Sequence, residues 1–223
     1  MNKIDFDDYA DNYGQLLQKQ LSFFDKKNYF AEYKIKILKQ QLNYEPVKIL
    51  DYGCGTGRNL KFLKQYFPNA KIYGCDISKK SLKIATKNNP DAILFLPNEN
   101  FDYKNFDLVF VAGVFHHIEP NLRTNILKQI HQLLTKNGSL VIFEHNPYNP
   151  VTLHMVNTCE FDDDVVLLKA REMKNLLRRA NFALKKTRYS LFIPKFLKKL
   201  RFLEKYLGLI PLGGQYFILA QKT

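Results

Sequence analysis

An apolar run that ends in a carboxylate and three alternate glycines carries the clearest chemical signal in this chain. Residues 48–60 read KILDYGCGTGRNL, in which Asp51 closes the run and the glycines are Gly53, Gly55 and Gly57. Glycines leave no side chains where a strand turns into a helix, so backbone N–H groups and an adenosine-bearing ligand can approach closely. The stretch therefore predicts a loop that binds a nucleotide-like cofactor.

The spacing of the glycines excludes two common nucleotide motifs. The dinucleotide fingerprint G-x-G-x-x-G needs a glycine three residues after Gly55, where this chain has Arg58. A P-loop would need a following Gly-Lys-Ser/Thr, which is absent from this stretch. The remaining pattern, D-x-G-x-G-x-G, suits a cofactor without a pyrophosphate, because the carboxylate of Asp51 would repel phosphates but can bind an ammonium group.

A second carboxylate follows the next predicted strand, in the run KIYGCDIS. Asp76 lies about 20 residues beyond the glycine loop, where a carboxylate normally binds the hydroxyls of a ribose. Its two oxygens can accept both hydroxyls at once. Ser78 is typical of an N-cap for the helix that follows, so Asp76 should lie at the carboxyl end of a strand. Ile77, between them, is a further candidate contact to the cofactor.

These residues resemble motif I of the class I S-adenosylmethionine-dependent methyltransferases, in particular the small-molecule type found in ubiquinone and menaquinone biosynthesis. The resemblance covers about residues 45–190, because NFDLVFVAGVFHHI and LLTKNGSLVIFEHNP look like the fourth and fifth strands of that family. It implies S-adenosylmethionine as cofactor and a Rossmann-like, seven-stranded, mostly parallel sheet with helices on both faces. It also implies that Ala112, at the end of the fourth strand, lines the methionine half of the cofactor.

One stretch departs from the family pattern. The family usually has an acidic residue soon after the third strand, which binds the adenine amino group, whereas this chain reads ILFLPNENFDYKN there. Asn98 or Glu99 could take that role, and the sequence does not choose between them.

Short apolar runs alternate with helical patterns along the chain, which predicts a parallel sheet covered on both faces. The expected strands are 47–51, 71–75, 92–96, 106–111, 139–144, 182–189 and 215–221. The expected helices are 58–66, 78–88, 121–134 and 169–180.

Two regions are predicted around the core of the domain at 46–223. Residues 1–45 resemble the helical N-terminal cap of small-molecule methyltransferases, and residues 147–168 are a predicted lid insertion after the fifth strand. Tyr9 and Tyr13 fall one helical turn apart. Tyr13 could therefore lie over the sulfonium of the cofactor, although two core tyrosines of an amphipathic helix would show the same spacing.

Polar side chains at the ends of the fourth and fifth strands are the catalytic candidates. S-adenosylmethionine carries an activated methyl group, so an enzyme must chiefly align the acceptor and exclude water, with a base needed if the acceptor is a hydroxyl. His117, Glu144 and His145 could do this, and imidazole titrates near pH 7. The alternatives are packing for His117, and also for His116 before it, and a turn network around Glu144, His145 and Asn146.

The formal charge of +13 is concentrated late in the chain. Residues 194–207 read as a basic amphipathic helix. Its apolar residues recur at intervals of three or four positions, at Phe196, Leu200, Leu203 and Leu207. That stripe either packs on the sheet or lets the helix contact an anionic membrane or a phosphate-rich substrate. A small-molecule or lipid-linked acceptor, including a saccharide, is the expected substrate.

Two other functions remain as alternatives. The charge would suit an RNA methyltransferase, but no RNA-binding module is recognisable. A non-catalytic cofactor-binding scaffold would not require the glycine loop and Asp76. No metal is expected, because the three cysteines form no C-x-x-C pair and Asp162 to Asp164 read as a solvated helix start. A charged N-terminus and the lack of an apolar run of roughly 18 residues predict a cytoplasmic protein, at most peripheral to the membrane.

Overall fold

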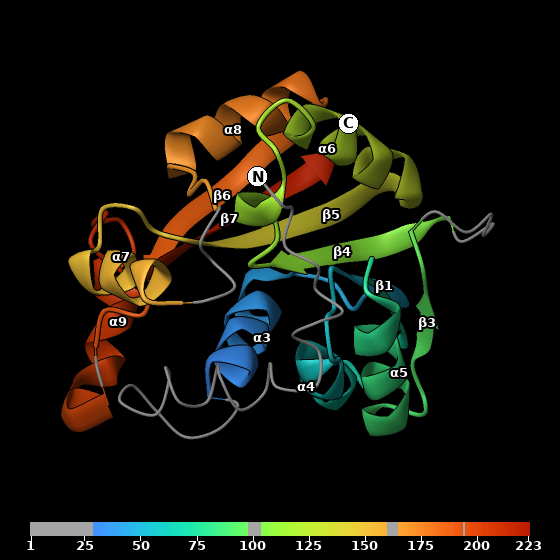
Figure 1. Cartoon of the computed structure of the whole chain (residues 1–223), viewed down its shortest axis with the longest axis horizontal. Helices are drawn as coiled ribbons and strands as arrows, with labels where there is room; N and C mark the ends of the chain where they lie inside the picture. Colours follow the sequence, from blue (N-terminus) through green and yellow to red (C-terminus); the bar gives the residue numbers. More distant parts are fainter. Residues whose placement is uncertain (1–28, 98–103, 160–164, 194) are drawn as a thin grey trace.

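The computed structural model of the chain describes residues 29–97, 104–159, 165–193 and 195–223. The strands are β1 (Lys48–Tyr52), β2 (Lys71–Cys75), β3 (Ile93–Phe95), β4 (Phe106–Ala112), β5 (Leu134–His145), β6 (Phe182–Ser190) and β7 (Gln215–Lys222). They form one seven-stranded sheet in the order β3-β2-β1-β4-β5-β7-β6 (Figure 1). β1 to β5 pair in parallel, and β7 is antiparallel to β5 and β6. The predicted Rossmann-like, mostly parallel sheet is confirmed.

Helices cover both faces of this sheet. They are α3 (Tyr29–Gln41), α4 (Arg58–Tyr66), α5 (Lys79–Asn88), α6 (Arg123–Leu133), α7 (Pro150–Asn157), α8 (Ala170–Arg179) and α9 (Glu204–Leu207), with the 3-10 helices η1 (Phe115–His117) and η2 (Lys195–Leu203). Figure 1 shows α6 and α8 on one face and α3, α4 and α5 on the other. Among the described residues, no helix combines the length and apolar character needed to cross a membrane.

Alternate side chains of the central strands enter two separate apolar clusters, one on each face. On β4, Val109 packs into the cluster that contains Met173 of α8, whereas Leu108 and Phe110 pack into the cluster that contains Ile35 of α3. This alternation follows from the period of two of a β-strand. The central strands are buried on both faces, so their carboxyl ends are held in fixed positions relative to each other.

Most element boundaries agree with the sequence patterns. α4 spans the predicted residues 58–66, and Ser78 caps α5 by accepting a 3.0 Å hydrogen bond from the backbone N–H of Ser81. β5 differs, because it begins at Leu134, five residues before its predicted start at residue 139. Leu134 is buried and pairs with Phe106 of β4, so the last residue of the predicted helix and the predicted loop after it extend the strand.

The two predicted accessory regions each contain a helix. α3 lies within the predicted cap at residues 1–45, and α7 lies within the predicted lid at residues 147–168. Tyr9 and Tyr13 lie outside the described residues, as do 160–164 of the lid. Closure of either region over a ligand stays a prediction.

The predicted amphipathic helix at 194–207 is irregular in the structure, and its exposed stripe matches the second of the two alternatives for its packing. The chain forms the 3-10 helix η2, which is kinked at Leu197, and then the four-residue α9. Leu200 and Leu203 of the apolar stripe are exposed instead of packing on the sheet. The reason is Glu204, which is buried and accepts hydrogen bonds from the Tyr33 hydroxyl and the Ile193 backbone N–H, so the acidic side of the segment faces inward.

Candidate active site

The carboxyl ends of β1, β2 and β4 meet at one edge of the sheet. In the pairing register, Tyr52 of β1 is level with Cys75 of β2 and Val111 of β4. The loops that follow these three strands therefore leave the sheet side by side. This edge is where open α/β sheets bind their ligands.

The three glycines of the loop after β1 have different roles. All have left-handed backbones, with φ of 75° at Gly53, 52° at Gly55 and 81° at Gly57. A Cβ at Gly53 would lie 2.5 Å from a methyl carbon of Val114, and one at Gly57 would lie 2.5 Å from the Asn89 amide nitrogen. A Cβ at Gly55 would meet none of the described residues within 4 Å. Gly53 and Gly57 are therefore required by packing, whereas Gly55 borders open space that a ligand can enter.

Asp51 is a buried carboxylate without a hydrogen-bond partner among the described residues. Burial raises the pKa of Asp51 to about 7, although the nearby Asn59 side chain and the Lys34 charge oppose the increase. An unpaired buried carboxylate is costly, and a cationic ligand would remove that cost. The orphaned oxygens of Asp51 therefore fit the ammonium group of an amino-acid cofactor.

Asp76 is held against the glycine loop by backbone hydrogen bonds. One carboxylate oxygen accepts from the N–H of Gly55 at 2.8 Å, and the other accepts from the N–H of Ser78 at 2.9 Å. Each oxygen can accept a further hydrogen bond, so the pair remains suited to ribose hydroxyls. Ile77, the next residue after Asp76, is 65% exposed.

Glu144 and His116 form a buried pair at the ends of β5 and β4. His116 Nδ1 lies 2.6 Å from one oxygen of Glu144, and the other oxygen accepts the backbone N–H groups of Val114 at 3.0 Å and Phe115 at 2.7 Å. Burial would raise the pKa of Glu144, but His116, His145 and the Phe115 N–H together lower it to about 2. Glu144 is thus an ionised side chain that fixes the turn after β4, and it is only 1% exposed.

His117 and His145 flank this pair. The His116 ring centroid lies 4.1 Å from that of His117 and 5.1 Å from that of His145. Burial and the neighbouring His116 lower the pKa of both outer histidines to about 3. Both rings are partly buried and neutral at pH 7. The structure therefore brings the three predicted catalytic residues together around His116, as a cluster of weak bases.

Lys34 of α3 is a site residue that the sequence reasoning missed. Burial and the charge of Arg58 lower the pKa of Lys34 to about 8, against the opposing effect of Asp51 and Glu144. Its charge also contributes to the lowered pKa of His145. The charge of Lys34 therefore influences groups of both the glycine loop and the histidine cluster. The signal for it was available, because Lys34 lies on the face of α3 that buries Ala31, Ile35 and Leu38.

Of the remaining predicted cofactor-binding residues, the structure describes Ala112 but not Tyr13. Ala112 is partly buried at the end of β4, and Gly113 after it donates a 2.9 Å hydrogen bond to the carbonyl of Phe143. Tyr13, Asn98 and Glu99 lie outside the described residues. Within the described part of the chain, no group of three or more acidic, histidine or cysteine side chains could hold a metal ion.

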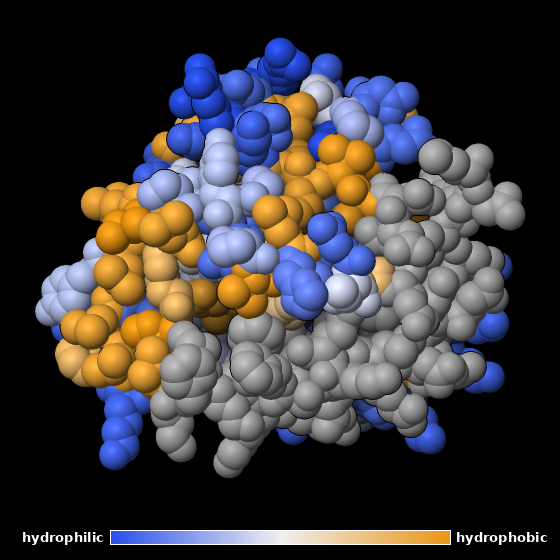
Figure 2. All heavy atoms as spheres, turned by 60° about the vertical axis from the view of Figure 1, so that its left-hand side comes forward, coloured by the Kyte–Doolittle hydropathy of each residue, from blue (hydrophilic) through white to orange (hydrophobic). Residues whose placement is uncertain are grey.

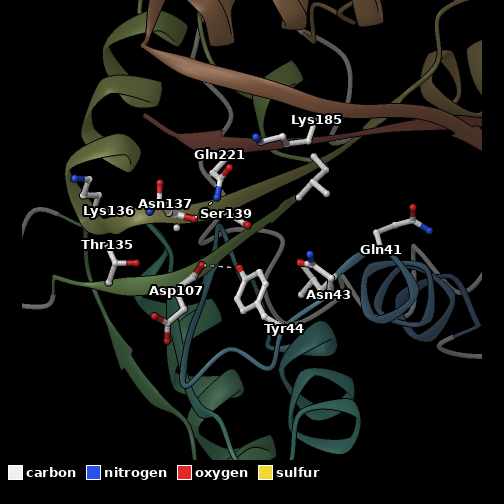
Figure 3. A pocket seen from close by; sticks show the side chains of 13 residues that line it. Gln41, Asn43, Tyr44, Asp107, Thr135, Lys136, Asn137, Ser139, Lys185 and Gln221 are labelled. Carbon is white, nitrogen blue, oxygen red and sulfur yellow. Dashed lines mark hydrogen bonds between the residues drawn. The ribbon is translucent and has the colours of Figure 1, made fainter.

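A polar hollow of about 620 Å³ lies away from the glycine loop and the histidine cluster (Figure 3). It is lined by the first residues of β4 and β5, including Asp107 and Ser139, and by Tyr44, which donates a hydrogen bond to the Asp107 carbonyl at 2.9 Å. Those residues mark the amino-terminal edge of the parallel strands. The hollow is therefore at the edge opposite the glycine loop and is separate from the candidate site.

Comparisons with known proteins agree with this geometry. A family model described as a methyltransferase domain matches residues 50–140. Demethylmenaquinone methyltransferase of Thermotoga maritima is 32% identical over 148 residues, which cover 65% of this chain and 61% of that protein. A tRNA N(3)-methylcytidine methyltransferase, Mettl2 of Drosophila melanogaster, is 25% identical over 118 residues, 47% of this chain and 36% of that protein. The chain thus spans less than two thirds of the length of either relative.

A solved structure shares the fold over nearly the whole chain. A SAM-dependent methyltransferase from Archaeoglobus fulgidus superposes with a TM-score of 0.71 at 16% identity, covering 94% of this chain and 100% of that one. The sheet order, the glycine loop and its two carboxylates define a Rossmann-like methyltransferase domain. The matches in sequence support a class I S-adenosylmethionine-dependent methyltransferase, the class that the fold and the loop also indicate. The cofactor of that family is S-adenosylmethionine, and the orphaned Asp51 oxygens and the open space at Gly55 fit it.

Proposed function

We propose that this chain transfers the methyl group of S-adenosylmethionine to a small or lipid-linked acceptor. The observation that carries the proposal is the buried carboxylate of Asp51, which has no hydrogen-bond partner among the described residues and precedes a loop that opens at Gly55. A cationic amino group is the ligand that such a carboxylate requires. S-adenosylmethionine carries one at its methionine end.

Four residues would hold the cofactor in this proposal. Asp51 would accept the ammonium group, and the charge of Lys34 beside it would bind the carboxylate of the same amino acid. Asp76, already oriented by the backbone of Gly55 and Ser78, would accept the ribose hydroxyls. Ala112 would line the methionine half. The opposite charges of Asp51 and Lys34 match the zwitterion of a free amino acid.

The cofactor, when bound, supplies a methyl group that is already activated for transfer. The protein must then orient the acceptor and exclude water. Neutral imidazoles at His117 and His145 can hydrogen-bond an acceptor, but a pKa of about 3 makes them weak bases. The site therefore suits an acceptor atom that is already nucleophilic better than a neutral hydroxyl. Glu144 contributes by fixing the backbone of Val114 and Phe115 and is a positioning residue.

A tRNA or other RNA acceptor is the second candidate. It is supported by the formal charge of +13 and by the similarity to a methyltransferase named for tRNA. Binding of RNA through lysine and arginine would weaken steeply with ionic strength, because phosphate contacts release counterions. Binding of a small neutral acceptor would be nearly independent of salt.

Transfer of a radiolabelled methyl group tests the proposal. The protein is incubated with labelled S-adenosylmethionine and, separately, a total lipid extract, a small-molecule extract and total RNA. We expect label in the lipid or small-molecule fraction, at least about tenfold less label with Asp76→Ala, and no loss with Asp91→Ala, which removes an exposed carboxylate. Label in RNA would favour the second candidate. No transfer to any fraction, despite cofactor binding, would favour a non-catalytic scaffold.

A further inference from the structure

The segment between β6 and β7 exposes large apolar side chains beside α7. Phe202 is 64% exposed, Tyr206 69% and Leu209 72%. Figure 2 shows apolar atoms gathered over this side of the molecule. An exposed apolar surface of this kind marks an interaction site more often than a solvated face. We define the C-terminal apolar surface by its exposed members, Val151, Leu153, Leu200, Phe202, Leu203, Tyr206, Leu209, Ile210 and Leu212.

Polar contacts underneath hold this surface in place. The amide nitrogen of Asn146 donates to the carbonyls of Pro211 at 3.0 Å and Gly213 at 2.8 Å, and that of Asn149 donates to the carbonyl of Leu212 at 2.7 Å. These bonds satisfy backbone groups while the side chains of Ile210 and Leu212 remain exposed. The apolar surface is therefore fixed by the fold.

A further set of contacts fixes the part of the surface formed by η2 and α9. Glu204 of α9 is buried and bonded to Tyr33 and Ile193, and the Arg201 guanidinium lies 4.0 Å from the centre of the Tyr29 ring. These contacts anchor η2 and α9 to α3, the helix that also carries Lys34. The outward position of Phe202 and Tyr206 follows from that anchoring.

Among the described residues from 195 to 212, the exposed charged side chains are positive. Glu204 is the acidic residue between 195 and 212, and its carboxylate is buried. Lys199 and Lys205 are exposed beside the apolar side chains. The cations of the segment are Lys195, Lys198, Lys199, Arg201 and Lys205. In the described residues of this segment, apolar and aromatic side chains lie beside exposed lysines while the one carboxylate is buried, a combination that complements an anionic lipid surface, into which the apolar groups insert while the lysines meet the headgroups.

We propose that the C-terminal apolar surface docks on an anionic bilayer and thereby presents the mouth of the site to an amphiphilic acceptor. The inference deepens the proposed function and rests on it for the second step. Asn146, which holds Pro211 and Gly213, directly follows His145 on the chain. Asn146 thus joins the docking surface to the end of β5, so docking would place the bilayer near the site from which a lipid-linked acceptor is methylated.

Flotation with vesicles tests the docking step. Vesicles of phosphatidylcholine alone are compared with vesicles that also contain phosphatidylglycerol. We expect wild-type protein to float with the anionic vesicles, and the double variant Phe202→Ser/Leu209→Ser to partition at least about tenfold less, since two exposed apolar side chains no longer insert. Val47→Ser is the matched control, because Val47 is 63% exposed at the opposite edge of the sheet.

The electrostatic part is tested by charge reversal. Lys199→Glu/Lys205→Glu should reduce partition into anionic vesicles by at least about fivefold, whereas Lys61→Glu, an exposed lysine of α4, should change it little. Equal binding to neutral and anionic vesicles, or unchanged binding of both double variants, would overturn the proposal. So would a dimer in light scattering that Phe202→Ser/Leu209→Ser dissociates, because the surface would then bind a second copy.

Binding of S-adenosylhomocysteine by the same proteins separates the two proposals. The surface variants should bind it with unchanged affinity, because they lie outside the cofactor residues. Cofactor binding without vesicle binding would refute the docking surface alone. Vesicle binding without cofactor binding would refute the proposed function and leave a membrane-docking domain.

Discussion

Asp51 and Glu144 are two buried carboxylates at the ends of β1 and β5, and their surroundings are opposite. Glu144 accepts hydrogen bonds from two backbone N–H groups and pairs with His116, and its pKa is lowered to about 2. Asp51 has no hydrogen-bond partner among the described residues, and burial raises its pKa to about 7. The protein itself therefore satisfies the charge of Glu144, whereas the carboxylate of Asp51 remains open to a cationic ligand.

Removal of the satisfied carboxylate should have the largest effect on stability. Glu144→Ala leaves His116 and the N–H groups of Val114 and Phe115 buried without their acceptor. We expect the free energy of unfolding to fall by about 3–5 kcal/mol, measured by urea denaturation. Glu45→Ala is the control, because Glu45 forms an exposed ion pair with Lys39 and should cost about 1 kcal/mol or less. An equal loss in both variants would contradict the internal role of Glu144.

Removal of the unsatisfied carboxylate should instead affect ligand binding. Asp51→Asn keeps the shape of the side chain but removes the charge that would bind the cofactor ammonium. We expect binding of S-adenosylhomocysteine to weaken by about 10- to 100-fold, with the free energy of unfolding of the ligand-free protein unchanged or increased. Calorimetry and urea denaturation measure the two quantities. A large loss of stability without a loss of affinity would show that Asp51 is satisfied internally after all.

The pH dependence of stability should distinguish the two carboxylates. The pKa of Asp51 is raised from 3.8 to about 7 on folding, so between these values the folded chain binds more protons than the unfolded one. Its contribution to stability is therefore present below pH 3.8 and is lost as the pH rises towards 7. The pKa of Glu144 is lowered, so its contribution is present above 4.5 and is lost as the pH falls towards 2.

The variant Asp51→Asn isolates the first of these effects. The lowered pKa values of His117 and His145 act in the opposite direction, increasing stability as the pH rises from about 3 to 6.5, but they are common to both proteins. The stability of Asp51→Asn relative to wild type should thus increase between pH 4 and 7. Urea denaturation across this range measures it, and a constant difference would mean that Asp51 titrates normally.

A smaller effect is expected at Lys34, whose charge interacts with both carboxylates. Lys34→Met keeps the length of the side chain but removes a charge that lowers the pKa of Asp51. We expect a roughly 3- to 10-fold weaker affinity for S-adenosylhomocysteine and a higher pKa of Asp51, seen as a shift of the pH at which affinity falls. Lys36→Met, on the exposed side of α3, is the control. Equal effects of both substitutions would remove Lys34 from the site.

The sequence was informative where the signal is local. The spacing of Gly53, Gly55 and Gly57, the N-cap Ser78 and the apolar runs of the strands depend on near neighbours, and they predicted the sheet, α4 and the cofactor loop. Lys34 was missed because its role depends on residues of other elements. The packing of the stripe in residues 194–207 was left open, because Glu204 bonds Tyr33, which is 171 positions away, and periodicity does not report which face is covered.

The most direct test of the central claim is a calorimetric titration with S-adenosylhomocysteine, using NAD as the control nucleotide. The account predicts one-to-one micromolar binding of S-adenosylhomocysteine, no binding of NAD, and more than tenfold weaker binding by Asp76→Ala, which loses charge-assisted contacts worth about 1.5–3 kcal/mol each. Comparable binding of NAD, or an unchanged dissociation constant for Asp76→Ala, would contradict the assignment of the glycine loop and its carboxylates to this cofactor.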